Sequence, residues 1–464
     1  MKRLLSLGLV VAITVSLMGC AGGQREGTES NASQADQGAA PGADQTEGDK
    51  GSEEKNNSSE QELTVWVSKV FSDDANAAIE ARALAFGEAR SISVTVEEIK
   101  ATELTNIVNA AVEAGVSVLP DVILWSSYGK FMYYYPDLVN REVSELFDEI
   151  NQEHPFIGKR SQGSLTIDGQ QYAVPFYNSP TLMYIRKDAM EAAGATTVPG
   201  TWEEVFDLAY KITEATDMYG LGWGSGPNDE DCENNTRMML WGQGAFQLSE
   251  DGFNDSPLYE EWADRYVQMY RDGVIPVDAT TWGSSGNNNS YLAEESAIVF
   301  NASTLTRALK ADHPELYANT IIANMPSSGE THLYDCSSAW TIMRESRNQD
   351  VAEDFIRWMM DYEWYSQFIQ SCAPVFCPIY QEIADTDFWR EDPDNLANVL
   401  YTESADAMHS YPSSEGKMVS AGMKIYQSYG FCNLLASMIN GASFQEAWDV
   451  YEASVKEILE MGKE

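Results

Sequence analysis

Short apolar runs alternate with amphipathic segments over residues 63–125, and this alternation limits the fold more than any other feature of the sequence. The runs Leu63–Val67, Ile92–Val96 and Val122–Trp125 have the length and composition of buried strands. Between them lie two segments whose apolar residues recur at helical spacing, and the second segment ends just before Gly115. A strand–helix–strand–helix–strand order is typical of a parallel sheet covered by helices. The sequence therefore predicts an α/β fold.

Polar and aromatic residues stand where two of these predicted strands end. Ser68 and Lys69 follow the first strand, while Trp125 ends the third strand and Ser126 follows it. Ligands of parallel α/β sheets lie at the carboxyl ends of the strands. We therefore expect these four residues to contact a ligand. The alternatives are core packing for Trp125 and a solvated surface position for Lys69.

Residues 171–187 form a second organising stretch. Two strand-like runs, Tyr172–Phe176 and Thr181–Ile185, are separated by the turn-prone sequence Tyr-Asn-Ser-Pro. We interpret this stretch as a crossing from one lobe of the protein to another. Tyr177 and Asn178 would then lie where a ligand is held between the lobes.

Further aromatic residues fall in glycine-rich stretches or at later strand ends. Residues 219–247 interleave glycine with aromatic residues, and loops of this kind can present rings to a ligand. The run Ala297–Phe300 reads as a strand that ends at a polar residue. For each tryptophan, core packing or loop anchoring is the alternative. The candidates from this part of the chain are Trp223, Trp241, Trp282, Asn301 and Trp340.

The first twenty residues predict export. Lys2 and Arg3 precede the apolar run Leu4–Leu17, which is too short to span a membrane comfortably. The run ends in Leu-Met-Gly-Cys, which resembles the lipobox of bacterial lipoproteins. The resemblance implies that a signal peptide, residues 1–19, is removed and that Cys20 carries a lipid.

Residues 20–61 and the body of the chain differ sharply in composition. After Cys20 the first segment contains no Val, Ile, Leu, Met, Phe, Trp or Tyr, so we expect a disordered tether. It holds nine acidic and three basic residues, and the signal peptide holds two basic residues. The remaining body therefore carries −39 of the formal net charge of −43. Such a charge disfavours nucleic acid as a partner. It fits a solvated acidic surface or, alternatively, a cationic ligand.

The cysteine, metal-site and catalytic patterns restrict the chemistry. With Cys20 lipidated, five cysteines remain, so they cannot all pair, although Cys372 and Cys377 could bridge locally. No Cys/His spacing matches a zinc site. Asp229–Asp231 and Asp385–Asp394 lack the alternating pattern of a calcium loop. No nucleophile elbow or phosphate loop is present, so we predict no metal, no cofactor and no catalytic residue. A glycosidase carboxylate pair stays open among so many acids.

Several stretches, in this order, resemble the extracellular solute-binding proteins of bacterial ABC importers. The group with the greatest resemblance binds sugars and oligosaccharides and includes maltose-binding protein. A single stretch of this kind is too variable to identify a family. Together the stretches occur in the family's order over nearly the whole body of the chain. The matching stretches are Leu63–Val67, Pro120–Trp125, Tyr172–Phe176, Leu182–Asp188, Pro199–Glu204, Ala297–Asn301, Trp340–Arg344 and Ala352–Trp358.

The resemblance implies two discontinuous α/β lobes of the type II periplasmic-binding-protein class, with a ligand cleft between them. One lobe would comprise residues 62–173 plus 304–336, and the other 174–300 plus 339–464. Closure of the lobes would bury a carbohydrate, and the closed form would dock on membrane permease subunits. No bond would be broken, so the protein would not be an enzyme. We expect a monomer that its lipid holds at the extracytoplasmic face of the cell membrane.

Two alternatives remain open at this point. The same fold can bind a polyamine or a peptide, which acidic residues facing the cleft would favour. A tethered extracellular glycoside hydrolase would instead need converging carboxylates. A sugar site needs aromatic faces for the ring and planar polar groups for the hydroxyls.

Overall fold

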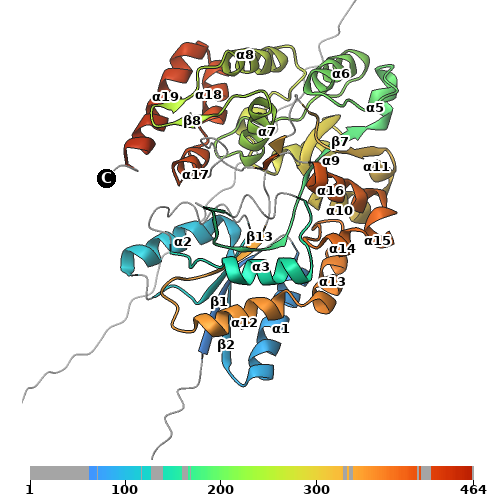
Figure 1. The fold of residues 1–464 in the computed structure, drawn as a ribbon. Helices are drawn as coiled ribbons and strands as arrows, with labels where there is room; N and C mark the ends of the chain where they lie inside the picture. Colours follow the sequence, from blue (N-terminus) through green and yellow to red (C-terminus); the bar gives the residue numbers. More distant parts are fainter. Residues whose placement is uncertain are drawn as a thin grey trace, which may run out of the picture. The chain divides into compact units, whose positions relative to one another are not determined.

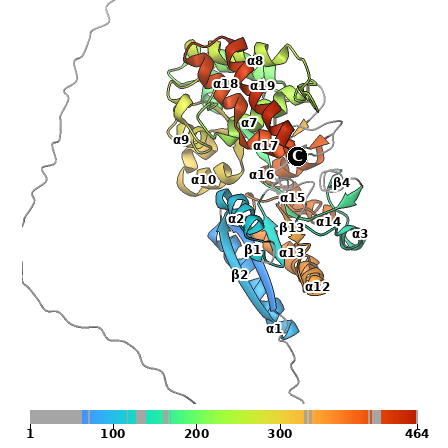
Figure 2. The same ribbon diagram turned by 90° about the vertical axis from the view of Figure 1, so that its left-hand side faces the viewer.

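Two sheets, each with its own hydrophobic core, organise the part of the chain that the structure describes (Figures 1 and 2). The structure is a computed structural model. It describes residues 62–69, 72–115, 118–126, 139–158, 166–167, 169–327, 332–333, 338–404, 407–408 and 420–461. The signal peptide, Cys20, the tether and Cys336 lie outside these ranges. None of the helices within them is both long and apolar enough to cross a membrane.

A five-stranded sheet in the order β2-β1-β3-β13-β6 forms the first lobe. The strands β1, β2 and β3 are parallel, as predicted, whereas β13 runs antiparallel to both β3 and β6. Helices α1 and α12 pack together beside this sheet, where the rings of Phe86 and Phe355 meet edge to face at 5.4 Å. The elements of this lobe are β1 (Glu62–Lys69), α1 (Asp73–Arg90), β2 (Ser93–Lys100), α2 (Ala101–Ala114), β3 (Val122–Trp125), α3 (Ser144–Glu153), β4 (Thr166–Ile167), β5 (Gln170–Gln171), β6 (Val174–Tyr177), β13 (Ser338–Ile342), α12 (Gln349–Met359), α13 (Tyr362–Ser371), α14 (Gln381–Ala384) and α15 (Asp387–Arg390).

A three-stranded antiparallel sheet in the order β10-β7-β11 forms the second lobe. Helices α8, α18 and α19 lie at one end of the described chain, opposite α1 and α12, in both views (Figures 1 and 2). The strands and helices of this lobe are β7 (Thr181–Arg186), α5 (Lys187–Ala192), α6 (Trp202–Ala215), α7 (Glu230–Trp241), β8 (Leu248–Ser249), β9 (Gly252–Phe253), α8 (Leu258–Arg271), the 3-10 helix η3 (Ala279–Thr281), α9 (Gly286–Leu292), β10 (Ile298–Ala302), α10 (Thr304–Asp312), α11 (Pro314–Ala318), β11 (Thr320–Ala323), α17 (Ser420–Gln427), α18 (Gly430–Ile439) and α19 (Phe444–Met461).

Three further elements join or flank the two lobes. Helix α16 (Pro393–Ser404) contributes residues to both hydrophobic cores. Strands β12 (His332–Leu333) and β14 (Ala407–Met408) pair in parallel as a two-stranded sheet. The third passage of the chain between the lobes therefore runs through α16.

The division into lobes differs from the predicted one in three segments. Residues from 174 on were expected in the second lobe, but β6 is an edge strand of the first sheet. Residues 304–336 were expected in the first lobe, but α10 buries Leu305 and Leu309 in the second core. Residues 339–464 were expected in the second lobe, but β13 lies between β3 and β6, and α12 buries Phe355 in the first core. A strand followed by a helix can pack on either sheet. Which sheet it joins depends on long-range pairing, which the local sequence does not encode.

Candidate functional site

The first crossing between the lobes is tied to a loop that follows α13. The backbone N–H of Asn178 donates to the carbonyl oxygen of Cys377 (3.0 Å), and the N–H of Cys377 donates to that of Asn178 (2.8 Å). The ring of Tyr177 stacks on that of Phe376 with a centroid distance of 4.0 Å. Burial raises the pKa of the Tyr177 hydroxyl. Tyr177 thus packs the hinge segment, and both predicted residues lie at the junction of the lobes.

The carboxyl end of the first sheet holds four more of the predicted residues. The register pairs Val67 with Leu124, so Ser68 and Trp125 follow at the same edge. Ser68 is fully buried, and its hydroxyl has no hydrogen-bond partner among the residues that the structure describes. Lys69 is half-exposed and pairs with Asp73 (3.6 Å) and Glu98 (3.4 Å). Ser126, half-buried, follows the strand.

Two of the tryptophans predicted as ligand contacts lie in the core of the first lobe. The indole N–H of Trp125 donates to the hydroxyl of Thr341 (2.9 Å), and its side chain is fully buried. Trp340 is also fully buried, with its ring against Phe176 (5.3 Å) and Phe355 (5.5 Å). Side chains alternate between the two faces of a strand, and in both cases the ring turns into the core.

The predicted tryptophans of the second lobe occupy three different environments. Trp223 is a core residue, with its ring 4.8 Å from that of Trp262 and 5.7 Å from that of Phe300. Trp241 is half-buried at the end of α7. Trp282 retains 8% of its exposed surface in a loop between η3 and α9.

Glycines allow the loop after residue 221 to pass close to Trp282. A Cβ atom on Gly224 would clash with the carboxylate of Asp229, and one on Gly226 would clash with the backbone of Trp282. A Cβ on Gly286 would clash with the indole ring itself. The glycine-rich sequence is therefore required for the backbone to approach this ring and this carboxylate.

Asn301, the last of the predicted residues, belongs to a buried group of side chains at the end of β10. Its amide nitrogen donates to Asp231 Oδ2 (3.1 Å) and to Asn287 Oδ1 (3.1 Å). The amide nitrogen of Asn287 donates to the same Asp231 oxygen (2.9 Å) and to the carbonyl of Phe300 (2.9 Å). We call Asp229, Asp231, Asn287 and Asn301 the acid–amide cluster.

Burial alters the electrostatics of this cluster. Asp229 caps α7 by accepting from the backbone N–H groups of Asp231 (3.1 Å) and Cys232 (3.2 Å). Burial nevertheless raises the pKa of Asp229 to about 6. Burial, together with the negative charge of Asp229, raises the pKa of Asp231 well above its usual range. Two carboxyl groups therefore stand close together in a poorly solvated place.

A buried ion pair stabilises the helix α7 that carries Asp231 of the cluster. Glu233 is fully buried and accepts from the backbone N–H groups of Phe431 (2.8 Å) and Cys432 (3.1 Å) at the start of α18. Its second oxygen lies 3.3 Å from Arg237 Nη2. The Arg237 guanidinium also lies over the ring of Phe246 (5.2 Å). These contacts fix the first turn of α7, which carries Asp231.

Sequence reasoning missed most of this cluster. It assigned Asn301 as a candidate, but weighed Asp229–Asp231 only as a calcium loop, whose pattern these residues lack, and left the Gly286–Ser290 run unused. The signal that could have found them is the run of three asparagines after a glycine. No grouping of three or more His, Cys, Asp or Glu side chains suited to a metal occurs in the described ranges. Cys372 and Cys377, considered as a local bridge, are both buried free thiols.

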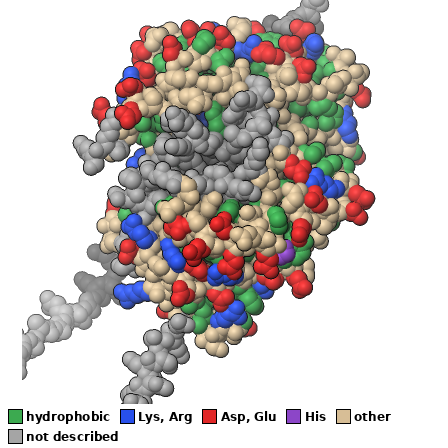
Figure 3. Space-filling view, in the orientation of Figure 1, with side chains coloured by type: hydrophobic (Ala, Val, Ile, Leu, Met, Phe, Trp, Pro, Cys, Tyr) green, Lys and Arg blue, Asp and Glu red, His purple; other side chains and the backbone are tan. Residues whose placement is uncertain are grey.

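Acidic side chains outnumber basic ones on the described surface that Figure 3 shows. They are spread over elements of both lobes rather than gathered in one patch. This distribution agrees with the formal net charge of −43 and with a solvated acidic surface.

Comparisons with known proteins give a consistent result. The sequence model of the family described as bacterial extracellular solute-binding protein matches residues 81–397. A Brucella abortus protein, provisionally named as a binding protein, is 24% identical over 268 residues, which cover 56% of this chain and 64% of that protein. A lactose-binding protein of Rhizobium radiobacter is 23% identical over 266 residues, which cover 54% of this chain and 59% of its own length. The chain thus matches less than two thirds of each relative.

Solved structures show the same fold. A solute-binding protein of an ABC transporter from Thermotoga lettingae, bound with α-D-tagatose, superposes with a TM-score of 0.66 at 18% identity. The match covers 86% of this chain and 100% of that one. A sugar transporter protein from Arthrobacter chlorophenolicus with bound laminaribiose gives a TM-score of 0.69 at 14% identity, covering 86% and 99% of the two chains. At these identities the likeness is one of fold.

Proposed function

The chain belongs to the family of bacterial extracellular solute-binding proteins, and we propose that it captures a carbohydrate by closing two lobes around it. Its fold is the two-lobed α/β fold of the type II periplasmic binding proteins, as the sequence predicted. Relatives and fold neighbours named for lactose, tagatose and laminaribiose support a sugar as the ligand.

The observation that carries the proposal is the acid–amide cluster beside Trp282. Both groups are planar: an amide can donate to and accept from the hydroxyls of a sugar, and a carboxylate accepts from them. An indole face suits the C–H side of the ring. Asp231, Asn287 and Asn301 are already hydrogen-bonded to one another, so their polar atoms are paired when no ligand is bound, and a sugar hydroxyl would add to these bonds.

The proposed contacts come from both lobes. The second lobe supplies Asn301 and Trp282, with Trp241 at the end of α7. The first lobe supplies Ser68, Lys69 and Ser126 at the end of its sheet. Tyr177 and Asn178 form the floor at the junction. A ligand that touches both groups only in the closed state shifts the population toward that state.

The remaining parts of the proposal concern location and partners. The family is extracellular. We propose that a lipid on Cys20 anchors this member to the cell membrane after signal-peptide removal, and that a tether of about forty residues, 20–61, holds the folded monomer near its permease. The closed form delivers the sugar to the permease without breaking a bond, so the protein is no enzyme.

The test is a thermal-shift and calorimetry screen of residues 20–464 with Cys20→Ser, against mono- and oligosaccharides, polyamines and peptides. We expect a sugar to raise Tm, with a stabilisation that grows as the logarithm of one plus the ratio of its concentration to Kd. A screen in which no sugar gives saturable heat would refute the carbohydrate assignment.

A cationic solute is the second candidate. Four acidic residues stand near one another at the start of α7: Asp229, Glu230, Asp231 and Glu233. Within this helix Arg237 forms an ion pair with Glu233. A bound cation would stabilise the charged carboxylates and lower their pKa values. Stabilisation by a polyamine alone would therefore replace the sugar assignment. Appearance of cleaved sugar in the same mixtures would instead indicate a hydrolase.

A further inference from the structure

Helix α16 lies on the boundary between the two hydrophobic cores. Ala397 and Tyr401 are buried in the second core, whereas Val399, on the opposite side of the helix, is buried in the first. A single helix therefore packs into both lobes. A change in the angle between the lobes must therefore alter the packing of this helix against at least one of the two cores.

A line of polar residues follows the same boundary. Asp394, Asn398 and Thr402 are spaced at i, i+4 and i+8, so they share one face of α16. All three are buried, with exposed fractions of 5%, 0% and 1%. We call them the boundary stripe.

Asn398, in the middle of the boundary stripe, is bonded to both lobes. Its amide oxygen accepts from the hydroxyl of Ser303 (2.6 Å), which joins β10 to α10 in the second lobe. Its amide nitrogen donates to the carbonyl of Pro374 (2.7 Å), which follows α13 in the first lobe. The amide is planar, so the directions of these two bonds are fixed relative to each other.

The side chains of the other two members of the boundary stripe, Asp394 and Thr402, each contact one lobe. Asp394 accepts from the hydroxyl of Tyr317 (2.7 Å) and from Lys310 Nζ (2.5 Å), both in the second lobe. The hydroxyl of Thr402 donates to the sulfur of Cys377 (3.8 Å), in the loop that pairs with the first crossing. Of the three side chains, Asn398 is thus the one that links both lobes directly.

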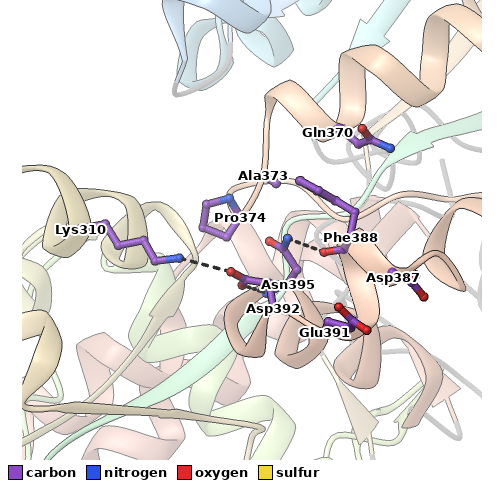
Figure 4. Close-up of a pocket in the computed structure, with 9 residues that line it drawn as sticks. All are labelled: Lys310, Gln370, Ala373, Pro374, Asp387, Phe388, Glu391, Asp392 and Asn395. Atoms are coloured by element: carbon purple, nitrogen blue, oxygen red, sulfur yellow. Dashed lines mark hydrogen bonds and ion pairs between the residues drawn. The ribbon is translucent and has the colours of Figure 1, made fainter.

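A cavity beside the stripe leaves room for movement at this junction. It has a volume of about 440 Å³ and lies between Lys310 on α10 and the segment from Ala373 to Asn395 (Figure 4). None of the predicted ligand-contact residues lines it. Close-packed interiors resist deformation. This open space reduces the packing between α10 and that segment, and the ion pair of Lys310 with Asp392 (4.0 Å) connects them there.

We propose that Asn398 is a positioning residue that sets the angle between the lobes and, with it, the free-energy difference between the open and closed states. Rotation of one lobe breaks the bond to Ser303 or the bond to Pro374, because one rigid amide serves both. Its effect on ligand affinity rests on the proposed function, whereas its effect on the lobe angle does not.

The experiment measures the lobe angle directly. Spin labels are attached at Leu84→Cys on α1 and Val277→Cys in the second lobe, two exposed positions, with Cys20 and Cys336 replaced by Ser. The distance distribution of the ligand-free protein is recorded by double electron–electron resonance. We expect Asn398→Ala to shift or broaden it, and Ser303→Ala to do the same to a smaller extent.

Asn395→Ala is the matched control. Asn395 is buried on the same helix and donates to the carbonyl of Phe388 (3.1 Å), so its loss affects stability without breaking a link to the second lobe. We expect its distance distribution to equal that of the unsubstituted protein. Unchanged distributions in both Asn398→Ala and Ser303→Ala would overturn the proposal. If Asn398→Ala does not fold, Ser303→Ala alone decides.

The same variants separate this inference from the proposed function. If a sugar binds, Asn398→Ala should change its Kd at least threefold while Asn395→Ala leaves Kd unchanged. An altered distance distribution with an unaltered Kd would overturn the affinity half of the proposal. Failure of every sugar to bind would refute the carbohydrate assignment, and the distance distributions would still decide the role of Asn398.

Discussion

The two lobes bury different kinds of side chain near their junction. The first lobe fills its core there with aromatic rings, among them Phe176, Tyr177 and Trp340. The second lobe also buries rings, such as Trp223 and Phe300, but adds carboxylate and amide groups, namely the acid–amide cluster and the Glu233–Arg237 pair. Rings satisfied by packing suit a rigid frame, whereas polar groups suit recognition of a polar ligand. Under the proposed function, the aromatic group would serve stability, the acid–amide cluster would serve binding, and the Glu233–Arg237 pair would hold the helix that carries Asp231.

Substitution of Trp340 should have the largest effect on stability. Trp340→Ala leaves a large cavity in the first core, and we expect unfolding to become easier by about 4 kcal/mol. Trp340→Phe, which keeps a ring beside Phe355, should cost much less. Urea unfolding measures both. Because the ring lies in the core, Kd of the folded fraction should stay unchanged. A large rise in Kd with little loss of stability would show that Trp340 contacts the ligand, and would contradict the assignment of the aromatic group to stability.

Removal of Glu233 tests the polar group of the second lobe. Glu233→Ala leaves Arg237 buried without its ion pair and two N–H groups of α18 without their acceptor. We expect a loss of about 3 kcal/mol in the free energy of unfolding. Glu230→Ala, in the same first turn but only half-buried, is the control and should change stability by less than about 1 kcal/mol. Equal effects would mean that Glu233 contributes no more than a surface acid.

The pH dependence of stability should reveal Asp229. An aspartate has a pKa near 3.9 in an unfolded chain, and burial raises that of Asp229 to about 6 in the folded protein. Between these values the folded state binds more protons than the unfolded state. The contribution of this group to stability therefore falls as pH rises from about 4 to about 6, by about 2 kcal/mol, and stays low above pH 6.

Asp229→Asn should remove that contribution, since the amide does not titrate while its oxygen can still cap α7. Unfolding free energies at pH 4.5 and 7, measured for both proteins, give the difference. We expect the difference in unfolding free energy, variant minus unsubstituted protein, to be more favourable to the variant at pH 7 than at pH 4.5. A difference that does not depend on pH would show that the Asp229 pKa is not raised.

The local sequence predicted more of the fold than of the site. The alternation over residues 63–125 predicted β1, β2 and β3 and their parallel order. Asn301 was found because a polar residue ends an apolar run. Its partners Asn287 and Asp231 lie 14 and 70 residues away, at or near the starts of two helices, so no local pattern joined them. Nor does a strand sequence reveal which face turns inward, and for that reason Trp125 and Trp340 were placed at the ligand.

The smallest expected effect is also the one that tests binding most directly. Asn301→Ala removes the amide that reaches both Asp231 and Asn287, and a sugar hydroxyl bound there loses one partner. We expect Kd to rise about tenfold, equivalent to about 1.4 kcal/mol, with a stability loss of about 1 kcal/mol. Asn288→Ala is the control, because Asn288 is a neighbour outside the acid–amide cluster. Calorimetric titration with the sugar found in the screen measures both. Equal Kd values for the two variants would show that the cluster supports the fold of the second lobe and does not contact the ligand.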